Sequence, residues 1–281
     1  MPSPAPRSSA PRSSSPRSPG PVCPSAVARL RAAGCVYAED EARLLLDAAP
    51  TPDDLDRMIR RRASGLPLEH VLGWAEFCGT RIAVDPGVFV PRRRTEFLVR
   101  RAADGAPDEA VVVDLCCGSG ALAAALTAVA AARGRAVAAV HAADVDPAAV
   151  ACARRNLAPS RGQVHCGDLF AALPSRLRGR VDVLLANVPY VPTDEIPLLP
   201  AEARLHEART ALDGGADGLD VLRRVAAGAP SWLAPGGRLL FETGERQTGT
   251  AAGIVAAAGL RPEVAVCDEL FATVIEAVAP A

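Results

Sequence analysis

The chain of 281 residues contains no lysine, and all 31 of its basic residues are arginine. Alanine, glycine and proline are abundant, so the simplest explanation is codon bias in a GC-rich genome. Arginine runs such as 60–62 and 92–94 are therefore weak indications of a docking patch for RNA or an acidic protein, and a solvated surface is the favoured explanation. The net charge of −1 indicates no partner class.

The sequence also lacks long apolar runs and paired cysteines. Its longest apolar stretch, residues 121–132, is too short for a membrane span, and the N-terminal MPSPAPRSSAPRSSSPRSPGP has no apolar core of the kind a secretory signal needs. None of the eight cysteines forms a C-x-x-C pair, and the four histidines do not cluster with them. We expect free thiols, no metal site and a cytoplasmic protein.

Composition divides the chain into four parts. Residues 1–22 are rich in Pro, Ser and Arg, and we expect a disordered tail. Residues 23–73 predict a small helical domain, which could recognise substrate or be a structural appendage. Ser25 is the expected cap of its first helix, and Thr51 followed by Pro52 starts its third. Residues 74–92 predict a hairpin linker, and 93–281 a catalytic domain opened by a helix that Thr95 caps.

From residue 108 the pattern alternates between strands and helices, which predicts an α/β fold with a mostly parallel sheet covered on both faces. A short connection joins the last two predicted strands, which indicates a final antiparallel insertion. The predicted strands cover residues 111–115, 136–144, 163–166, 181–186, 237–242, 262–267 and 272–278.

A cofactor loop follows the first of these strands. It comprises Cys116, Cys117, Gly118, Ser119 and Gly120, and glycines there let a ligand approach the backbone closely. Asp144 ends the second strand, where it can hold ribose hydroxyls. The same residues also fit G-x-G-x-x-A, the dinucleotide fingerprint, so this loop alone does not separate a nicotinamide cofactor from S-adenosylmethionine.

Three further features favour S-adenosylmethionine. Asp114 lies four residues before the first glycine of the loop, where a carboxylate suits an ammonium group and repels a pyrophosphate. Asp168 and Leu169 follow the third strand, beside the expected position of an adenine. The fourth strand ends in a motif that begins with Asn187, in the same crevice at the carboxyl edge of the sheet.

That motif is Asn187-Val188-Pro189-Tyr190. A planar NH2 nitrogen is a poor nucleophile because its lone pair is delocalised. Two acceptors aimed at its N–H groups hold the nitrogen in line with the methyl–sulfonium bond and raise its electron density. The Asn187 side-chain oxygen and the Val188 carbonyl are the predicted acceptors, Pro189 fixes the backbone, and the Tyr190 ring packs on the planar group. The alternative is a strand that ends in an ordinary Pro turn.

DLCCGSGAL, ADVDPAAV, GDLF and NVPY, in this order, resemble the HemK-like protein-(glutamine-N5) methyltransferases that modify peptide-chain release factors, within the class I S-adenosylmethionine-dependent fold. RRASGLPLEHVLGWAEFCGTRIAVDPGVFVPRRRTEFLV and HEARTALDGGADGLDVLRR extend the resemblance to about 25–281. It implies a Rossmann-like catalytic domain with a seven-stranded sheet, and a glutamine amide bound by Asn187 and the Val188 carbonyl. It also implies cofactor binding by residues 116–120, Asp144 and the region around Asp168 and Leu169.

The sequence departs from the family at three places. Val188 replaces the usual Pro, Glu207 is followed by Ala208 in place of Pro, and residues 268–277 lack the usual Gly and Arg. These departures leave open a divergent branch with another protein substrate. The motifs are also compatible with a nucleic-acid amino methyltransferase, which would need a basic channel and base flipping, and with a cofactor-binding scaffold that lacks activity.

Overall fold

The computed structural model describes residues 23–281; the predicted tail, 1–22, lies outside the described residues. Backbone contacts divide the chain between Ala63 and Ser64 into two compact units, which are described separately below. The division precedes the end of the helical domain expected at residue 73, because the short helix α4 (Leu68–Leu72) belongs by its contacts to the second unit. No helix of the described residues is long and apolar enough to span a membrane.

The first unit is a bundle of three short helices: α1 (Pro24–Ala32), α2 (Ala38–Ala48) and α3 (Pro52–Ala63). Thr51 caps α3 as predicted, since its hydroxyl accepts a hydrogen bond of 3.1 Å from the Asp54 N–H. The predicted Ser25 cap is wrong: Pro24 already occupies the first helical position, and Cys23 is the N-cap. Arg62 of α3 donates twice to Glu41 of α2, at 2.6 and 3.0 Å.

The second unit begins with α4 and the predicted hairpin of β1 (Trp74–Phe77) and β2 (Thr80–Ala83). Cys78 and Gly79 connect the strands with φ values of 50° and 69°, the left-handed pair that two-residue hairpin turns need. Phe77 and Ile82 are fully buried. The hairpin is therefore packed into the catalytic unit.

A seven-stranded sheet forms the centre of this unit, in the order β5-β4-β3-β6-β7-β9-β8. The strands from β5 to β7 in this order are parallel, and β9 is antiparallel to both β7 and β8, so the predicted antiparallel insertion is confirmed. The strands are β3 (Ala110–Leu115), β4 (Val137–Asp144), β5 (Gln163–Cys166), β6 (Val181–Ala186), β7 (Leu233–Glu242), β8 (Arg261–Cys267) and β9 (Ala272–Val278).

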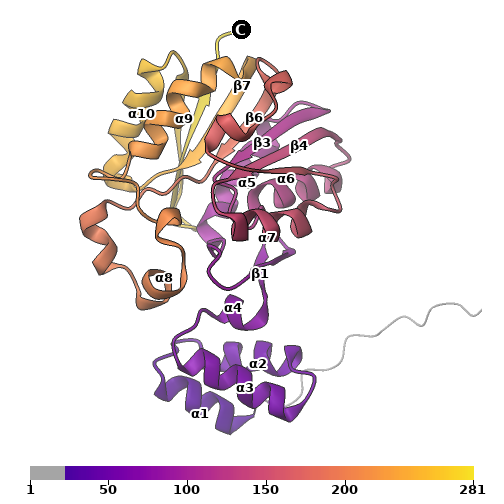
Figure 1. Cartoon of the computed structure of the whole chain (residues 1–281), viewed down its shortest axis with the longest axis vertical. Helices are drawn as coiled ribbons and strands as arrows, with labels where there is room; N and C mark the ends of the chain where they lie inside the picture. Colours follow the sequence, from indigo (N-terminus) through magenta and orange to yellow (C-terminus); the bar gives the residue numbers. More distant parts are fainter. Residues whose placement is uncertain (1–22) are drawn as a thin grey trace, which may run out of the picture. The chain divides into compact units, whose positions relative to one another are not determined.

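Helices cover both faces of the sheet (Figure 1). Because side chains alternate along a strand, Val113 and Leu115 pack in one core with α9 and α10, while Val112 packs in another with α5, α6 and α7. The helices are α5 (Glu96–Gly105), α6 (Ala121–Ala132), α7 (Pro147–Leu157), α8 (Ala201–His206), α9 (Asp220–Gly228) and α10 (Thr248–Ala257). The 3-10 helices are η1 (Arg93–Thr95), η2 (Leu169–Ala172), η3 (Ser175–Leu177), η4 (Thr193–Leu198), η5 (Arg209–Ala211), η6 (Ala229–Ser231) and η7 (Glu245–Gln247).

The strand order reverses at β3, which lies between β4 on one side and β6 on the other. In an open parallel sheet the crevice at the carboxyl ends of the strands at such a reversal is the usual binding site. The loops after β3, β4 and β6 meet at this edge. Each of them carries residues that the sequence singled out.

Candidate active site

The glycine-rich loop after β3 is shaped by two left-handed glycines. Gly118 has a φ of 53° and Gly120 a φ of 74°. A β-carbon on Gly120 would lie 3.1 Å from the Ala153 Cβ of α7, whereas one on Gly118 would meet nothing closer than the Phe89 Cβ at 3.9 Å. Gly120 therefore allows helix packing, and Gly118 leaves backbone open to a ligand.

Asp144, at the end of β4, anchors this loop. Its Oδ2 accepts a hydrogen bond of 2.8 Å from the Gly118 N–H, and its Oδ1 accepts one of 2.9 Å from the Asp146 N–H. Burial raises the pKa of Asp144, although these bonds act in the opposite direction. Since each carboxylate oxygen has a second lone pair, Asp144 can hold the loop and still accept hydroxyl donors from a ligand.

Asp114 lies beneath the loop and is completely buried. Its Oδ2 accepts a bond of 3.2 Å from the Ala123 N–H, and its Oδ1 has no hydrogen-bond partner among residues 23–281. Burial raises the pKa of Asp114 to about 8, and the nearby Asp144 adds to the shift. The carboxyl group is therefore largely protonated at neutral pH until a cation approaches.

Asp168 and Leu169 follow β5. Asp168 forms an ion pair of 2.5 Å with Arg224 of α9, and both side chains are more than half exposed. Leu169 adopts a left-handed φ of 45° and packs into the core beside α9. A ligand that donates a hydrogen bond to Asp168 would have to share the carboxylate with Arg224.

At the end of β6, the Asn187 Oδ1 is shielded from solvent and has no hydrogen-bond partner among residues 23–281. A buried acceptor left without a donor costs about 1–3 kcal/mol, so it needs an explanation. Val188 and Pro189 are buried. A bound N–H group could donate the hydrogen bond that the Asn187 oxygen lacks.

The Tyr190 hydroxyl is held by a network that the sequence did not predict. It donates to Glu242 Oε1 at 3.0 Å and accepts from Arg94 Nη2. Arg94 Nε and the Thr95 hydroxyl also bind Glu242, each at 2.7 Å. Thr95 precedes α5, but its hydroxyl bonds to Glu242 and not to the helix, so the predicted side-chain cap is wrong.

This network fixes the tyrosine ring and keeps its hydroxyl neutral. Burial raises the pKa of Tyr190 to about 12, with Glu242 contributing. Burial likewise raises the pKa of the Cys116 thiol and that of the Cys117 thiol well above the ordinary value for cysteine. Neither the phenol nor these thiols therefore supplies an anionic base or nucleophile at neutral pH.

Glu207 connects the two loops that cover the site. Its buried carboxylate accepts from the Val90 N–H at 3.1 Å and from Arg92 Nη2 at 2.8 and 2.6 Å. Burial raises the pKa of Glu207, and Arg92 acts against that shift. The Ala208 N–H also donates to the Gly87 carbonyl at 3.2 Å, so the segment after β6 is tied to the segment after the hairpin.

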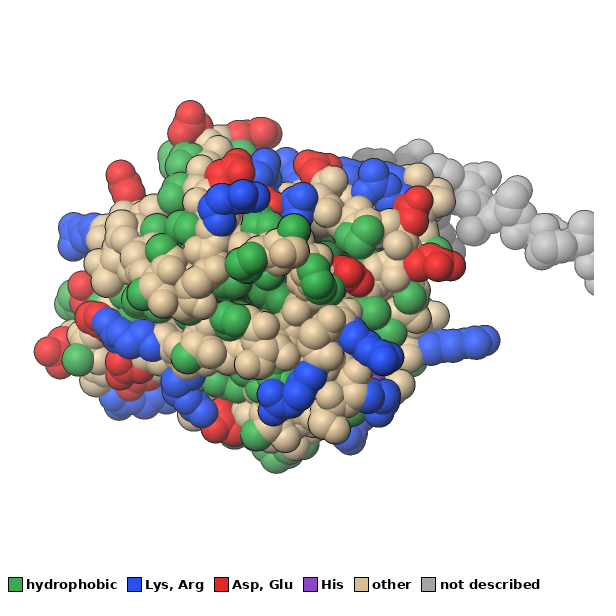
Figure 2. Space-filling view, turned by 90° about the horizontal axis from the view of Figure 1, so that it is seen from above, with side chains coloured by type: hydrophobic (Ala, Val, Ile, Leu, Met, Phe, Trp, Pro, Cys, Tyr) green, Lys and Arg blue, Asp and Glu red, His purple; other side chains and the backbone are tan. Residues whose placement is uncertain are grey.

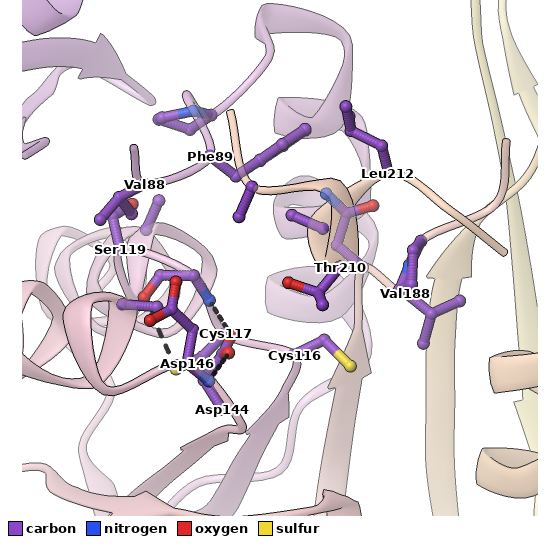
Figure 3. A pocket seen from close by; sticks show the side chains of 18 of the residues that line it. Val88, Phe89, Cys116, Cys117, Ser119, Asp144, Asp146, Val188, Thr210 and Leu212 are labelled. Carbon is purple, nitrogen blue, oxygen red and sulfur yellow. Dashed lines mark hydrogen bonds between the residues drawn. The ribbon is translucent and has the colours of Figure 1, made fainter. Parts of the chain in front are cut away.

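Together these elements enclose a cavity of about 750 Å³, a size typical of small-molecule sites. Figure 3 shows Asp144 and Asp146 at one end and Val188 and Leu212 at the other. Asp114 and Gly120 do not line it. The predicted site residues that do are Cys116, Cys117, Gly118, Ser119, Asp144, Asp168, Leu169, Asn187, Val188, Pro189 and Tyr190.

The sequence missed the residues that close the cavity from other segments. Val88, Phe89 and Arg92 come from the loop after the hairpin, Thr210 and Leu212 from the segment after β6. Side chains of these types carry no local signal of a site. Only their position within the segments that resemble the methyltransferase family could have indicated them.

Comparison with known proteins identifies the chain. It is 39% identical over 258 residues to the release factor glutamine methyltransferase of Cereibacter sphaeroides, covering 84% of this chain and 89% of that protein. The release factor glutamine methyltransferase of Geobacter sulfurreducens is also 39% identical, over 72% of this chain and 69% of its own length. The chain belongs to the release factor glutamine methyltransferase family.

The family model of the methyltransferase small domain matches residues 79–217, which hold the glycine loop, Asp144 and Asn187. Two solved structures share the fold alone. The ribosomal protein L11 methylase of Lactobacillus delbrueckii is 17% identical with a TM-score of 0.50, over 71% of this chain and 86% of that one. A methyltransferase from Pyrococcus furiosus is 15% identical with a TM-score of 0.53, over 72% and 90%.

Family membership confirms the predicted class I methyltransferase fold and selects methyl transfer over nicotinamide chemistry for the glycine loop. The question that the loop alone left open was which cofactor a G-x-G-x-x-A pattern serves. The glycine loop and the Asn187 motif line the same cavity.

Proposed function

We propose that this enzyme transfers a methyl group from S-adenosylmethionine to the side-chain amide nitrogen of a glutamine in a peptide chain release factor. The names of its relatives support the substrate. The observation that carries the proposal is the Oδ1 of Asn187, a residue that lines the cavity; this oxygen is buried and has no hydrogen-bond partner among residues 23–281. An amide N–H is the complementary donor, and its arrival would satisfy an acceptor that is otherwise costly to bury.

The residues at the sheet edge fit S-adenosylmethionine. Gly118 leaves backbone open to the cavity, the Asp144 oxygens have lone pairs for ribose hydroxyls, and Leu169 offers an apolar surface for a base. Asp114, buried beneath the loop with its Oδ1 unpartnered among residues 23–281, is neutral in the free protein and would become ionised as the ammonium group of the ligand approaches. When bound, S-adenosylmethionine supplies an electrophilic methyl group.

The chain's own residues position and polarise the nucleophile. The Asn187 Oδ1 and the Val188 carbonyl accept the two N–H groups of the glutamine amide, which fixes the nitrogen and raises its electron density. Pro189 holds the backbone, and the Tyr190 ring is fixed by Glu242 and Arg94. Preorganised acceptors of this kind lower a barrier by several kcal/mol. The nitrogen loses its proton after the methyl group has been transferred, so no strong base is required.

Neither the net charge nor the relatives of the chain favour the alternative of a nucleic-acid substrate. On the face drawn in Figure 2, arginine and acidic side chains are interspersed and neither sign gathers into a field. The net charge is −1. A nucleic-acid enzyme would need a basic channel.

Methylation of purified release factor tests the proposal. Tritiated S-adenosylmethionine is incubated with the enzyme and release factor, RNA or DNA, and the labelled residue is located by mass spectrometry. We expect the label on a glutamine of the protein. Labelling of RNA or DNA alone would contradict the substrate assignment, and absence of any labelling would contradict the enzyme assignment.

We also propose that the helical unit, 23–63, recognises the protein substrate. It presents Val36 and Tyr37, 83% and 71% exposed, in the connection between α1 and α2. Neighbouring exposed apolar side chains are typical of protein contacts. Tyr37→Ala should raise the KM for release factor without changing S-adenosylmethionine affinity, and an unchanged KM would remove this patch from recognition.

A further inference from the structure

A second cavity of about 450 Å³ lies at the carboxyl end of β7, beside the turn between β8 and β9. It shares Tyr190 and Arg94 with the first cavity. One layer of side chains, held by Glu242, therefore separates the two. A glutamine in a protein cannot enter the first cavity without bringing its chain neighbours to the surface beside it.

The turn beside this cavity presents an aromatic ring to solvent. Phe271 is 90% exposed and Val266 is 63% exposed, and both line the cavity. Phe271 also has a φ of 50°, a left-handed conformation that is rare for a bulky residue. An exposed ring in a strained turn indicates a contact surface whose partner contributes the missing packing.

The charges at the rim identify the class of partner. Arg94 is paired with Glu242, whereas the carboxylates of Glu245 and Asp268 have no ion-pair partner within residues 23–281. Both line the cavity. The cavity thus combines an apolar ring with two unpaired negative charges, which complements a side chain that has an aliphatic stem and a cationic end.

We propose that the second cavity binds an arginine or lysine side chain of the substrate protein, close in sequence to the methylated glutamine. This inference rests on the proposed function, because it assumes that the substrate is a protein whose glutamine occupies the first cavity. The stem lies against Phe271 and Val266, and the cation lies between Glu245 and Asp268. The second cavity would then favour protein substrates that carry a basic residue near the methylated glutamine over a free glutamine amide.

Coupling between enzyme and substrate variants tests the inference. Each arginine or lysine near the methylated glutamine of release factor is replaced by alanine, one at a time. Transfer is measured with wild type, with Glu245→Gln/Asp268→Asn, and with Phe271→Asn, which suits the left-handed turn. Val264→Ala is the matched control, because Val264 is 45% exposed on β8 but lies outside the cavity.

With wild-type factor, the double variant should raise the KM about fivefold and Phe271→Asn about tenfold. The kcat and the S-adenosylmethionine affinity should not change, and Val264→Ala should match wild type. Replacing one particular basic residue of the factor by alanine should raise the KM measured with the wild-type enzyme. The same replacement should leave the KM measured with the double variant unaltered.

Two results would overturn the inference. If wild type methylates the factor and every substrate substitution has the same effect on wild type and on the double variant, the cavity does not bind a basic residue. If wild type transfers no methyl group to the glutamine, the proposed function fails, and the inference fails with it. Measuring transfer by wild type first distinguishes the two.

Discussion

The two ends of the large cavity differ in how completely the protein satisfies its own polar groups. At the Asp144 end, both carboxylate oxygens accept backbone N–H bonds. At the Asn187 end, the side-chain oxygen has no partner among the described residues. The Asp144 bonds thus hold the glycine loop without help from a ligand, whereas the unpartnered Asn187 oxygen is the acceptor that we propose for the group to be methylated. We therefore assign the Asp144 end to binding of the cofactor and the Asn187 end to positioning of the nucleophile.

Replacing Asn187 by alanine should have the largest effect. It removes an acceptor that matters most as the target nitrogen becomes positive, so single-turnover transfer should fall about 10²–10³-fold. Asn187→Asp retains an oxygen at this position and serves as the control. S-adenosylmethionine affinity, measured by calorimetry, should change little in both. Normal transfer by Asn187→Ala would refute the role of this oxygen.

Asp114 provides a test in pH, because its pKa is raised from 3.8 to about 8 by burial. Between these values the folded protein holds a proton that the unfolded chain releases, so stability is greatest at low pH and falls as pH rises towards 8. The loss should be on the order of a few kcal/mol. Asp114→Asn should abolish this dependence.

The comparison must be a difference between wild type and Asp114→Asn. Burial lowers the pKa of His141 to about 4, with His165 contributing, so His141 makes stability rise with pH between about 4 and 6.5. That opposing contribution is present in both proteins and cancels. Urea unfolding from pH 5 to 8 gives the difference, and parallel curves for the two proteins would show that Asp114 ionises normally.

The cofactor end is tested by Asp144→Ala. The substitution removes acceptors for ribose hydroxyls and also releases the Gly118 and Asp146 N–H groups, so S-adenosylmethionine affinity should fall at least about tenfold. Asp144→Asn keeps one side-chain oxygen and should lose less. Equal affinity for Asp144→Ala and wild type in calorimetry would place the ribose elsewhere.

Local patterns predicted the strands and the order of the motifs. Short apolar runs placed β3 and β6, and the short connection before residue 272 indicated the antiparallel insertion of β9. The Ser25 cap was wrong because Pro24 competes for the same helix start. The structural domain boundary likewise depends on tertiary contacts of α4, which no local propensity encodes.

The site was predictable where one segment carries its chemistry. Asn187 and the glycine loop were found because a polar or flexible residue interrupts a buried strand. The Tyr190, Glu242 and Arg94 network joins residues separated by 52 and 96 positions, and nothing local reveals it. The internal bonds of Asp144 were hidden for the same reason, because a carboxylate at a strand end has the same sequence whether its oxygens are bonded or open.

The smallest expected effect on transfer concerns Val188, whose carbonyl and not its side chain is the proposed acceptor. Val188 is 3% exposed and belongs to the core shared with α9. Val188→Ala should therefore cost ~1–2 kcal/mol of stability through lost packing, while single-turnover transfer stays within about threefold of wild type.

Val188→Pro separates the backbone from the side chain at this position. It retains the carbonyl and introduces the residue usual in the family, so it should fold and transfer at the wild-type rate or faster if Val188 loosens the backbone. Both variants are assayed with wild type on the same release factor after circular dichroism confirms folding. A folded Val188→Ala enzyme that no longer transfers would mean that the side chain shapes the amide site, and the second acceptor would then have to be sought among the other atoms of the cavity wall.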